Sequence, residues 1–311
     1  MNHPLPRLLS RQHSGTVVLF GEVLADRFPD GDVLGGAPFN VARHLKAFGL
    51  NPVLITRVGN DELKDELMRR MVDCGMETLG VQIDPEHPTG QVLVHFEDGK
   101  HRFEIAPDQA YDHIHAGMAE RTSLSIQPDL VYFGTLAQRN KVSRRALCNL
   151  LRCDAPRMLD LNLREPWYNV HILKRSLQRA SFVKMNIEEL EKISGMLDLP
   201  GRSADDFARG LIARYAIRRL IVTCGEQGAW QKTDKGIETR SDGAEPVEIV
   251  DTVGAGDGFS AVCILGMLKG WTDAETIGRA NRFASRICAI RGAVPENSEF
   301  YDPHLRDWGI R

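Results

Sequence analysis

Residues 251–261 read Asp251-Thr252-Val253-Gly254-Ala255-Gly256-Asp257-Gly258-Phe259-Ser260-Ala261. They separate a strand that we predict at 247–250 from an apolar helix that we predict at 259–268. Gly254 and Gly256 allow a close backbone turn, which leaves the amides of residues 255–257 unpaired at the N-terminus of the helix. Unpaired amides and the helix dipole together bind an anion. The segment therefore predicts a phosphate-binding loop.

Asp257 is the reactive side chain of this loop. A carboxylate beside a bound phosphate can accept the proton of an attacking hydroxyl group. The alternative is a tight turn in which Asp257 only caps the helix. Because the whole eleven-residue pattern lies between strand and helix, we predict a catalytic site. Asp257 is its general base, and Gly254, Ala255 and Gly256 are its anion-binding loop.

A second glycine motif occurs near the N-terminus, where Gly35-Gly36-Ala37-Pro38-Phe39-Asn40 precedes a predicted helix. The two glycines permit close approach of a ligand to the backbone, and the Asn40 amide both donates and accepts hydrogen bonds. The alternative is an ordinary glycine turn with Asn40 solvated or capping the helix. The bulky Phe39 is expected to narrow any pocket at this place.

The rest of the chain alternates strands and helices, with strands predicted at 16–20, 52–58, 130–133, 157–161, 182–185 and 219–223. This alternation predicts an α/β fold with a mostly parallel central sheet covered on both faces. A hairpin at 89–105 interrupts the pattern, with Asp98-Gly99 as its turn. We therefore predict a flexible tail at 1–15 and one domain at 16–311. Segments 22–34 and 88–106 would form its small β-sheet lid.

Composition narrows the classes of partner. The 39 Lys and Arg oppose 42 Asp and Glu, for a formal net charge of −3, so neither nucleic acid nor an anionic membrane is an expected partner. The six cysteines are scattered without a C-x-x-C pair, which is typical of a cytoplasmic protein with reduced thiols. No apolar run reaches the ~18 to 20 residues of a membrane span, and no H-E-x-x-H motif indicates a transition metal.

The two glycine motifs resemble the signatures of the ribokinase-like, or PfkB, carbohydrate kinases, D-T-x-G-A-G-D and G-G-x-x-x-N-x-A. The resemblance extends from about residue 17 to 295 and implies the three-layer ribokinase-like fold. In the family, the residue matching Asp257 is the general base, and the amides matching Ala255 and Gly256 form the anion hole. The residues matching Asp251 and Thr252 commonly lie beside an activating monovalent cation, with K⁺ as the candidate here.

The resemblance also implies a sugar site, to which Gly35, Gly36, Asn40 and Asp26 would contribute. The hairpin resembles the family's β-lid, which closes over the sugar and excludes water. Arg102 on this hairpin could touch the sugar, although a solvated lid charge is the alternative. The lid often forms a homodimer contact in relatives, which makes a homodimer an expectation for this chain.

Two central motifs extend the resemblance. Asp160-Leu161-Asn162-Leu163-Arg164 is similar to a D-x-N-x-R motif of fructokinase-like members. That similarity places Arg164 near the acceptor or the transferred phosphate, while Asp160 could equally form a structural salt bridge. Asn186 and Glu189 match an N-x-x-E motif that holds Mg²⁺ through water in relatives. A helix-capping Asn with a surface Glu is the alternative.

The nucleotide site is implied by a V-T-x-G-x-x-G turn at 222–228. Thr223, Gly225 and Gly228 would approach ATP there, and Asn281 resembles a position near adenine. Residues 291–295 resemble the loop that closes the cation site.

The sequence thus predicts an ATP- and Mg²⁺-dependent sugar kinase, with fructose converted to fructose 6-phosphate as the first choice. Ribose, 2-keto-3-deoxygluconate or a phosphorylated sugar are alternative acceptors. A dinucleotide-binding oxidoreductase would need G-x-G-x-x-G after the first strand, where this chain has Gly21-Glu22-Val23-Leu24. A non-catalytic sugar-binding regulator is a further alternative, which the presence of Asp257 and its glycines disfavours.

Overall fold

The computed structural model describes residues 15–28, 31–97, 100–243 and 246–310. Its main sheet has nine strands in the order β13-β12-β11-β10-β9-β8-β1-β4-β5. The strands are β1 (Thr16–Phe20), β4 (Asn51–Gly59), β5 (Val81–Asp84), β8 (Leu130–Phe133), β9 (Arg157–Asp160), β10 (Phe182–Asn186), β11 (Arg219–Thr223), β12 (Ala229–Thr233) and β13 (Glu238–Arg240). Pairing is parallel from β5 to β11, whereas β12 and β13 add an antiparallel edge. The predicted mostly parallel sheet is confirmed.

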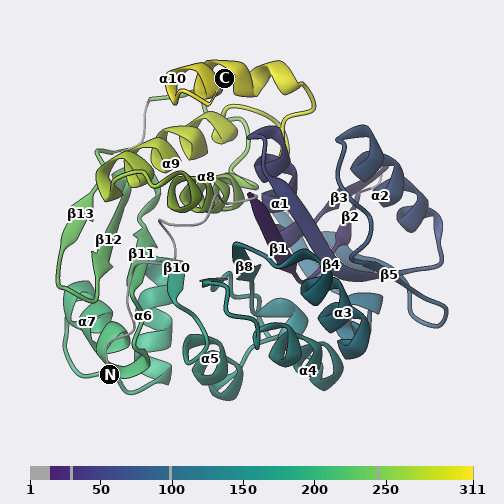
Figure 1. Cartoon of the computed structure of the whole chain (residues 1–311), viewed down its shortest axis with the longest axis horizontal. Coiled ribbons are helices and arrows are strands. Elements are labelled where there is room, and N and C mark those ends of the chain that lie inside the picture. Colours follow the sequence, from purple (N-terminus) through teal and green to yellow (C-terminus); the bar gives the residue numbers. More distant parts are fainter. Residues whose placement is uncertain (1–14, 29–30, 98–99, 244–245, 311) are drawn as a thin grey trace.

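Helices cover both faces of this sheet (Figure 1). One face packs against α1 (Ala37–Ala47), α2 (Glu62–Asp73), α8 (Ala255–Lys269), α9 (Asp273–Cys288) and α10 (Asp302–Asp307). The other packs against α3 (Ala116–Ile126), α4 (Lys141–Leu150), α5 (Val170–Leu177), α6 (Ile187–Met196) and α7 (Ala204–Tyr215). The central strand β1 serves both layers, because Val17 and Leu19 enter one core while Val18 and Phe20 enter the other.

A separate four-stranded sheet has the order β3-β2-β6-β7. It consists of β2 (Leu24–Phe28), β3 (Gly31–Gly35), β6 (Gly90–Glu97) and β7 (Lys100–Ile105). These are the segments in which the sequence predicts additional β-structure. Arg102 lies on β7, but its side chain is outside the described residues, as are the turn at 98–99 and residues 1–14 of the predicted tail.

The strand predicted at 247–250 is wrong. Residues 246–250 have no regular structure, and the side chains of Ile249 and Val250 are 67% and 59% exposed. Instead of pairing with a strand, this segment bonds to the end of α9, since the amides of Val250 and Asp251 donate to the Cys288 carbonyl at 2.9 and 3.2 Å. An apolar run alone therefore gave a misleading signal for β-structure here.

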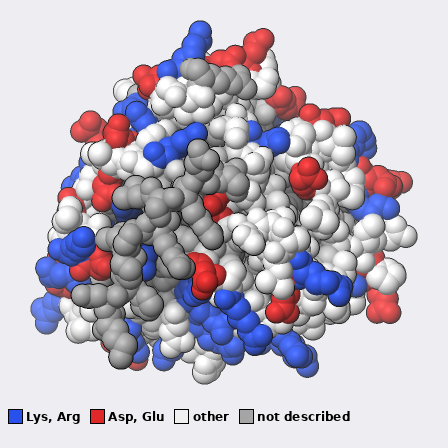
Figure 2. All heavy atoms as spheres, viewed as in Figure 1, with Lys and Arg blue, Asp and Glu red and all other residues white. Residues whose placement is uncertain are grey.

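The charges are mixed over the visible surface. Figure 2 shows acidic and basic side chains interspersed on the face of Figure 1, with basic groups gathering over α4 and α5. Within the described ranges, no helix combines the length and the apolar character that a membrane crossing requires.

Candidate active site

The two glycine motifs meet in one place. The Asn40 side-chain amide, in the first turn of α1, donates to Oδ2 of Asp257 in the first turn of α8 at 2.8 Å, although the two residues are 217 positions apart. Oδ1 of Asn40 is buried and has no partner among the described residues. The predicted sugar-binding residue and the predicted base therefore share a single site, and one polar atom there is free for a ligand.

The start of α8 has the geometry expected of an anion-binding loop. Gly254 caps the helix at φ +79°, and a Cβ at this position would lie 2.4 Å from Cα of Ala293. The amide of Ala255 makes a long 3.4 Å bond to the Thr252 carbonyl, while the amides of Gly256 and Asp257 belong to the helix turn that has no intrahelical acceptor. These last two are the best-placed donors for a phosphate oxygen.

The environment of Asp257 weakens its acidity. Burial raises the pKa of this half-buried carboxyl from 3.8 to about 6, against the Asn40 hydrogen bond, which lowers it. The negative charge of Asp160 raises the pKa further, while the positive charges of Lys184 and Arg164 lower it. A carboxylate with a pKa just below neutrality is ionised at pH 7 and is a stronger base than an ordinary Asp.

A buried ion pair lies beneath the anion loop. Lys184 on β10 and Asp160 on β9 are directly paired in the sheet, and the Lys184 ammonium lies 3.1 and 3.2 Å from the two Asp160 oxygens. The hydroxyls of Tyr132 and Ser260 donate to the same carboxylate at 3.1 and 2.7 Å. All four residues are buried. The structural salt bridge considered for Asp160 is therefore present.

Lys184 also touches the loop above it. A Cβ at Gly256 would lie only 3.1 Å from Nζ of Lys184. Burial lowers the pKa of this ammonium, but the charges of Asp160, Glu189 and Asp257 outweigh it and leave the pKa raised, so the positive charge is retained. Lys184 belongs to none of the motifs predicted from the sequence. Its signal was a single lysine inside an apolar strand, which is unusual without a buried partner.

The remaining predicted sugar residues lie on β2 and just before α1. Asp26 on β2 is half-buried, and its pKa is raised by burial and lowered by the charge of Arg164. Gly36 has φ +108°, and a Cβ there would lie 2.7 Å from the Glu22 carbonyl oxygen, so only glycine fits. The expectation for Phe39 is wrong, since its ring is fully buried in the core between α1 and the main sheet.

Arg164 is exposed, and its charge lowers the pKa of Glu22, Asp26 and Asp257 alike. It is thus a cation that acts on all three carboxyl groups, and its position near the transferred phosphate stays a prediction. Asn162, in the same motif, has the rare backbone value φ +39°.

Asn186 and Glu189 form a capping box at the start of α6. Asn186 Oδ1 accepts the Glu189 amide at 2.7 Å, and Glu189 Oε2 accepts the Asn186 amide at 2.9 Å. Glu189 Oε1 accepts the amide of Leu163 at 2.6 Å, which fixes the end of the D-x-N-x-R segment. Burial raises the pKa of Glu189. The helix-capping alternative describes this geometry, and a role toward a metal stays a prediction.

The predicted nucleotide turn follows β11. Thr223 ends the strand, while Gly225 and Gly228 have φ +56° and +84°. A Cβ at Gly228 would lie 2.3 Å from the Asp242 carbonyl. The Asn281 amide, on α9, donates to the carbonyls of Asp242 and Gly243 at 3.0 and 3.2 Å, so its donor group holds this loop against the turn.

Asp251 joins two loops at the predicted cation site. Its Oδ1 accepts the Val253 amide and its Oδ2 accepts the Gly292 amide, both at 3.0 Å. Thr252 beside it is exposed. The segments 251–254 and 291–293 are therefore in contact, and a cation site between them stays a prediction.

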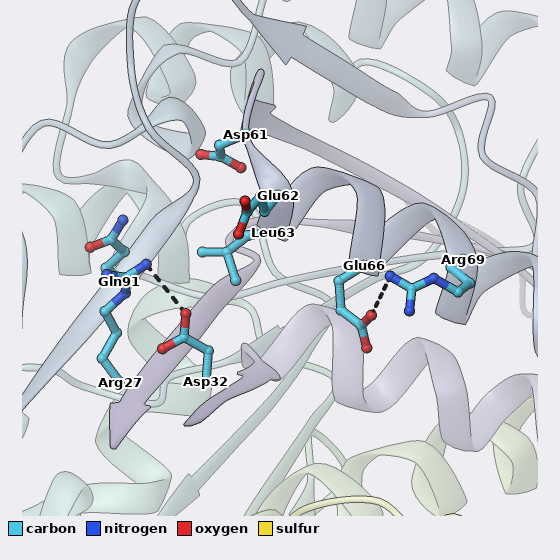
Figure 3. Close-up of a pocket in the computed structure, with 8 residues that line it drawn as sticks. All are labelled: Arg27, Asp32, Asp61, Glu62, Leu63, Glu66, Arg69 and Gln91. Atoms are coloured by element: carbon cyan, nitrogen blue, oxygen red, sulfur yellow. Dashed lines mark ion pairs between the residues drawn. The ribbon is translucent and has the colours of Figure 1, made fainter. Parts of the chain in front are cut away.

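A separate pocket is lined by residues outside the candidate active site. A pocket of about 460 Å³ lies between the small sheet and α2, and none of the predicted site residues lines it. Its charged groups largely pair with one another, as Figure 3 shows for Arg27 with Asp32 and Glu66 with Arg69. Because successive strand residues face opposite sides, Arg27 places this pocket behind the face of β2 that carries Asp26.

Comparison with known proteins agrees with this geometry. Residues 30–299 match the model of the pfkB family carbohydrate kinases. The chain belongs to this family. Fructokinase from Escherichia coli is 28% identical over an alignment of 296 positions, which covers 89% of this chain and 93% of that protein. Membership makes the protein an ATP-dependent carbohydrate kinase.

Solved structures show the same ribokinase-like fold. The fructokinase from Xylella fastidiosa with bound ATP superposes with a TM-score of 0.80 at 21% identity, covering 95% of this chain and 99% of that one. The fructokinase from Vibrio cholerae O395 in the form bound to fructose, ADP and calcium ion gives a TM-score of 0.75 at 22% identity, covering 93% and 98%.

Proposed function

We propose that this enzyme transfers the γ-phosphoryl group of ATP to the primary hydroxyl of a neutral sugar, with fructose giving fructose 6-phosphate as the first candidate. The observation that carries the proposal is the Asn40–Asp257 hydrogen bond, because it joins the sugar motif to the phosphate loop. The choice of fructose is supported by the curated and solved relatives named fructokinase.

In the proposed mechanism, Asp26, Asn40 and the backbone at Gly35 and Gly36 bind the sugar. Asp257 accepts the proton of the attacking sugar hydroxyl while the oxygen of that hydroxyl bonds to the γ-phosphorus. The bond from that phosphorus to the β–γ bridging oxygen breaks, and ADP leaves. The negative charge that develops during transfer would be stabilised by the amides of Gly256 and Asp257 and by the cations Lys184 and Arg164.

The remaining groups would hold ATP and its cations. Thr223, Gly225 and Gly228 would contact the nucleotide, with Asn281 shaping the adjacent loop. Each Glu189 oxygen already accepts one amide, so its remaining lone pairs suit Mg²⁺ held through water together with Asn186. Bound Mg²⁺ would neutralise phosphate charge. Asp251 and Thr252 offer the oxygen ligands that an alkali cation such as K⁺ prefers.

The small sheet would act as the lid. It carries Asp26 and, on β7, Arg102, and its closure over the sugar would exclude the water that hydrolyses ATP. We further propose that residues 16–311 form one domain, with the lid at 22–34 and 88–106. The protein would be cytoplasmic, and two copies would associate through their lids.

The substrate can be tested by a coupled ADP-release assay over ketoses, aldoses and sugar acids, each with K⁺ or Na⁺. We expect kcat/KM to be highest for fructose and higher in K⁺. A higher value for ribose or 2-keto-3-deoxygluconate would contradict fructose while leaving the kinase assignment intact. If none of the sugars in the panel gave ADP release, the proposed function itself would be contradicted.

The pH dependence tests the role of Asp257. Its pKa is raised to about 6, and only the ionised form can accept a proton. The value of kcat/KM is therefore expected to be maximal at pH values above this pKa and to decrease as the pH falls below it. We expect kcat/KM to fall ~10-fold per pH unit below about pH 6. A profile that stays flat to pH 4.5 in the folded enzyme would contradict this base.

A further inference from the structure

Three buried polar atoms near the sugar motif lack a hydrogen-bond partner. They are Oε2 of Glu22, the hydroxyl of Tyr111 and Nη1 of Arg139, and none has a partner among the described residues. Glu22 is 5% exposed and Tyr111 is not exposed at all. Each buried polar atom without a hydrogen bond lowers the free energy of unfolding by about 1 to 3 kcal/mol. Three from different parts of the fold therefore indicate a ligand that satisfies them.

Arg139 and Tyr111 are in contact and rigidly held. The Arg139 guanidinium lies 4.9 Å over the Tyr111 ring and 4.3 Å over the Trp167 ring. Its Nε and Nη2 bind both oxygens of Asp112 at 2.8 and 2.7 Å, and Nη2 also donates to the Ala106 carbonyl. The buried ion pair neutralises the arginine and leaves Nη1 as its free donor.

The backbone at Glu22 and Val23 lies close both to this pair and to the sugar motif. A Cβ at Gly90 would meet both the Val23 carbonyl at 2.4 Å and Cε1 of Tyr111 at 2.8 Å, which places the end of the Tyr111 ring against the residue that follows Glu22. The Glu22 carbonyl is itself the atom that forbids a side chain at Gly36. The backbone at Glu22 and Val23 is therefore close both to Gly36 of the sugar motif and to the Tyr111 ring, over which Arg139 lies.

The Glu22 carboxyl interacts electrostatically both with Arg139 of this cluster and with the proposed base Asp257. Burial raises its pKa to about 7, Arg164 and Arg139 lower it, and Asp257 raises it. Arg139 is neutralised by Asp112 and Arg164 is exposed. A ligand with a negative group at this place would therefore meet an acidic side chain, whereas hydroxyl groups could both donate to it and accept from it.

We propose that Glu22, Tyr111 and Arg139 form a further subsite of the sugar pocket, which reads hydroxyl groups of a neutral sugar and disfavours sugars that carry a carboxylate or phosphate there. This proposal rests on the proposed sugar-kinase function and specifies its substrate class. A pocket built to bond hydroxyls discriminates strongly against analogues that leave its buried groups unpaired.

The test compares Tyr111→Phe and Glu22→Gln with the matched control Tyr215→Phe. Tyr215 is also a buried tyrosine whose hydroxyl lacks a partner among the described residues, but it lies on α7. KM is measured for the best neutral sugar and for ATP, together with kcat/KM for a sugar acid. Sugar binding to the wild type is measured separately by calorimetry.

We expect both site variants to raise the sugar KM ~10-fold or more, with the ATP KM unchanged and Tyr215→Phe equal to the wild type. Glu22→Gln should also narrow the preference for the neutral sugar over the sugar acid. An unchanged sugar KM in both site variants of an active enzyme would overturn the subsite alone. A wild type that neither binds nor phosphorylates a neutral sugar would overturn the proposed function, and the subsite with it.

Discussion

Asp257→Asn is expected to lower kcat by about 10²- to 10⁴-fold, the usual contribution of a general base. The Asn side chain keeps an oxygen that can accept the Asn40 hydrogen bond, but it cannot take the proton of the sugar hydroxyl. Steady-state kinetics with saturating ATP and sugar measure the loss. Binding of ATP, measured by calorimetry, should be retained, because the loop amides remain in place.

The same variant should be more stable than the wild type, which separates lost chemistry from lost folding. The raised pKa of Asp257 means that the folded state holds this proton more tightly than the unfolded state does. The carboxyl therefore favours folding most below its ordinary pKa of 3.8, and this contribution is lost as the pH rises through about 6. At pH 7, Asn should raise the free energy of unfolding by about 1 to 3 kcal/mol. A stable variant with near-normal kcat would contradict the assigned base.

Lys184→Met is expected to have the largest effect on stability and a second large effect on turnover. It leaves Asp160 buried without its cation, which should lower the free energy of unfolding by about 3 to 5 kcal/mol. It also removes the positive charge beneath the anion loop, which should lower kcat by about 10²-fold. Chemical denaturation and steady-state kinetics measure the two effects.

The double variant Asp160→Asn/Lys184→Met distinguishes a structural from an electrostatic role. Removing both charges leaves no buried ion unpaired, so most of the lost stability should return. The kcat should stay low, because no cation lies under Gly256. A refolded double variant with kcat close to the wild type would show that Lys184 only holds the sheet together.

Local signals in the sequence accounted for much of the fold. The strands at 16–20 and 219–223 are short β-rich runs bounded by glycine or polar residues, and both have the predicted limits. The close turns at the glycine motifs could also be predicted, since Gly36 and Gly254 occupy backbone conformations that other residues avoid. The segment at 247–250 failed because its partner is the end of a helix rather than a strand.

The contacts between segments distant in the chain could not be predicted from the sequence. Lys184 pairs with Asp160 because β9 and β10 are neighbours in register, and nothing local specifies that register. Glu22, Tyr111 and Arg139 come from three separate segments, and their shared property, a buried atom without a partner, exists only in the folded chain. Resemblance to a family selected the residues of its motifs and therefore missed these side chains.

Transfer of the γ-phosphoryl group of ATP to a sugar hydroxyl by this chain is tested most directly by ³¹P NMR of the enzyme with ATP, Mg²⁺ and fructose. We predict that a hexose phosphomonoester signal grows in equal amount to ADP. ADP accompanied only by inorganic phosphate, or no consumption of ATP with any neutral sugar, would contradict the claim.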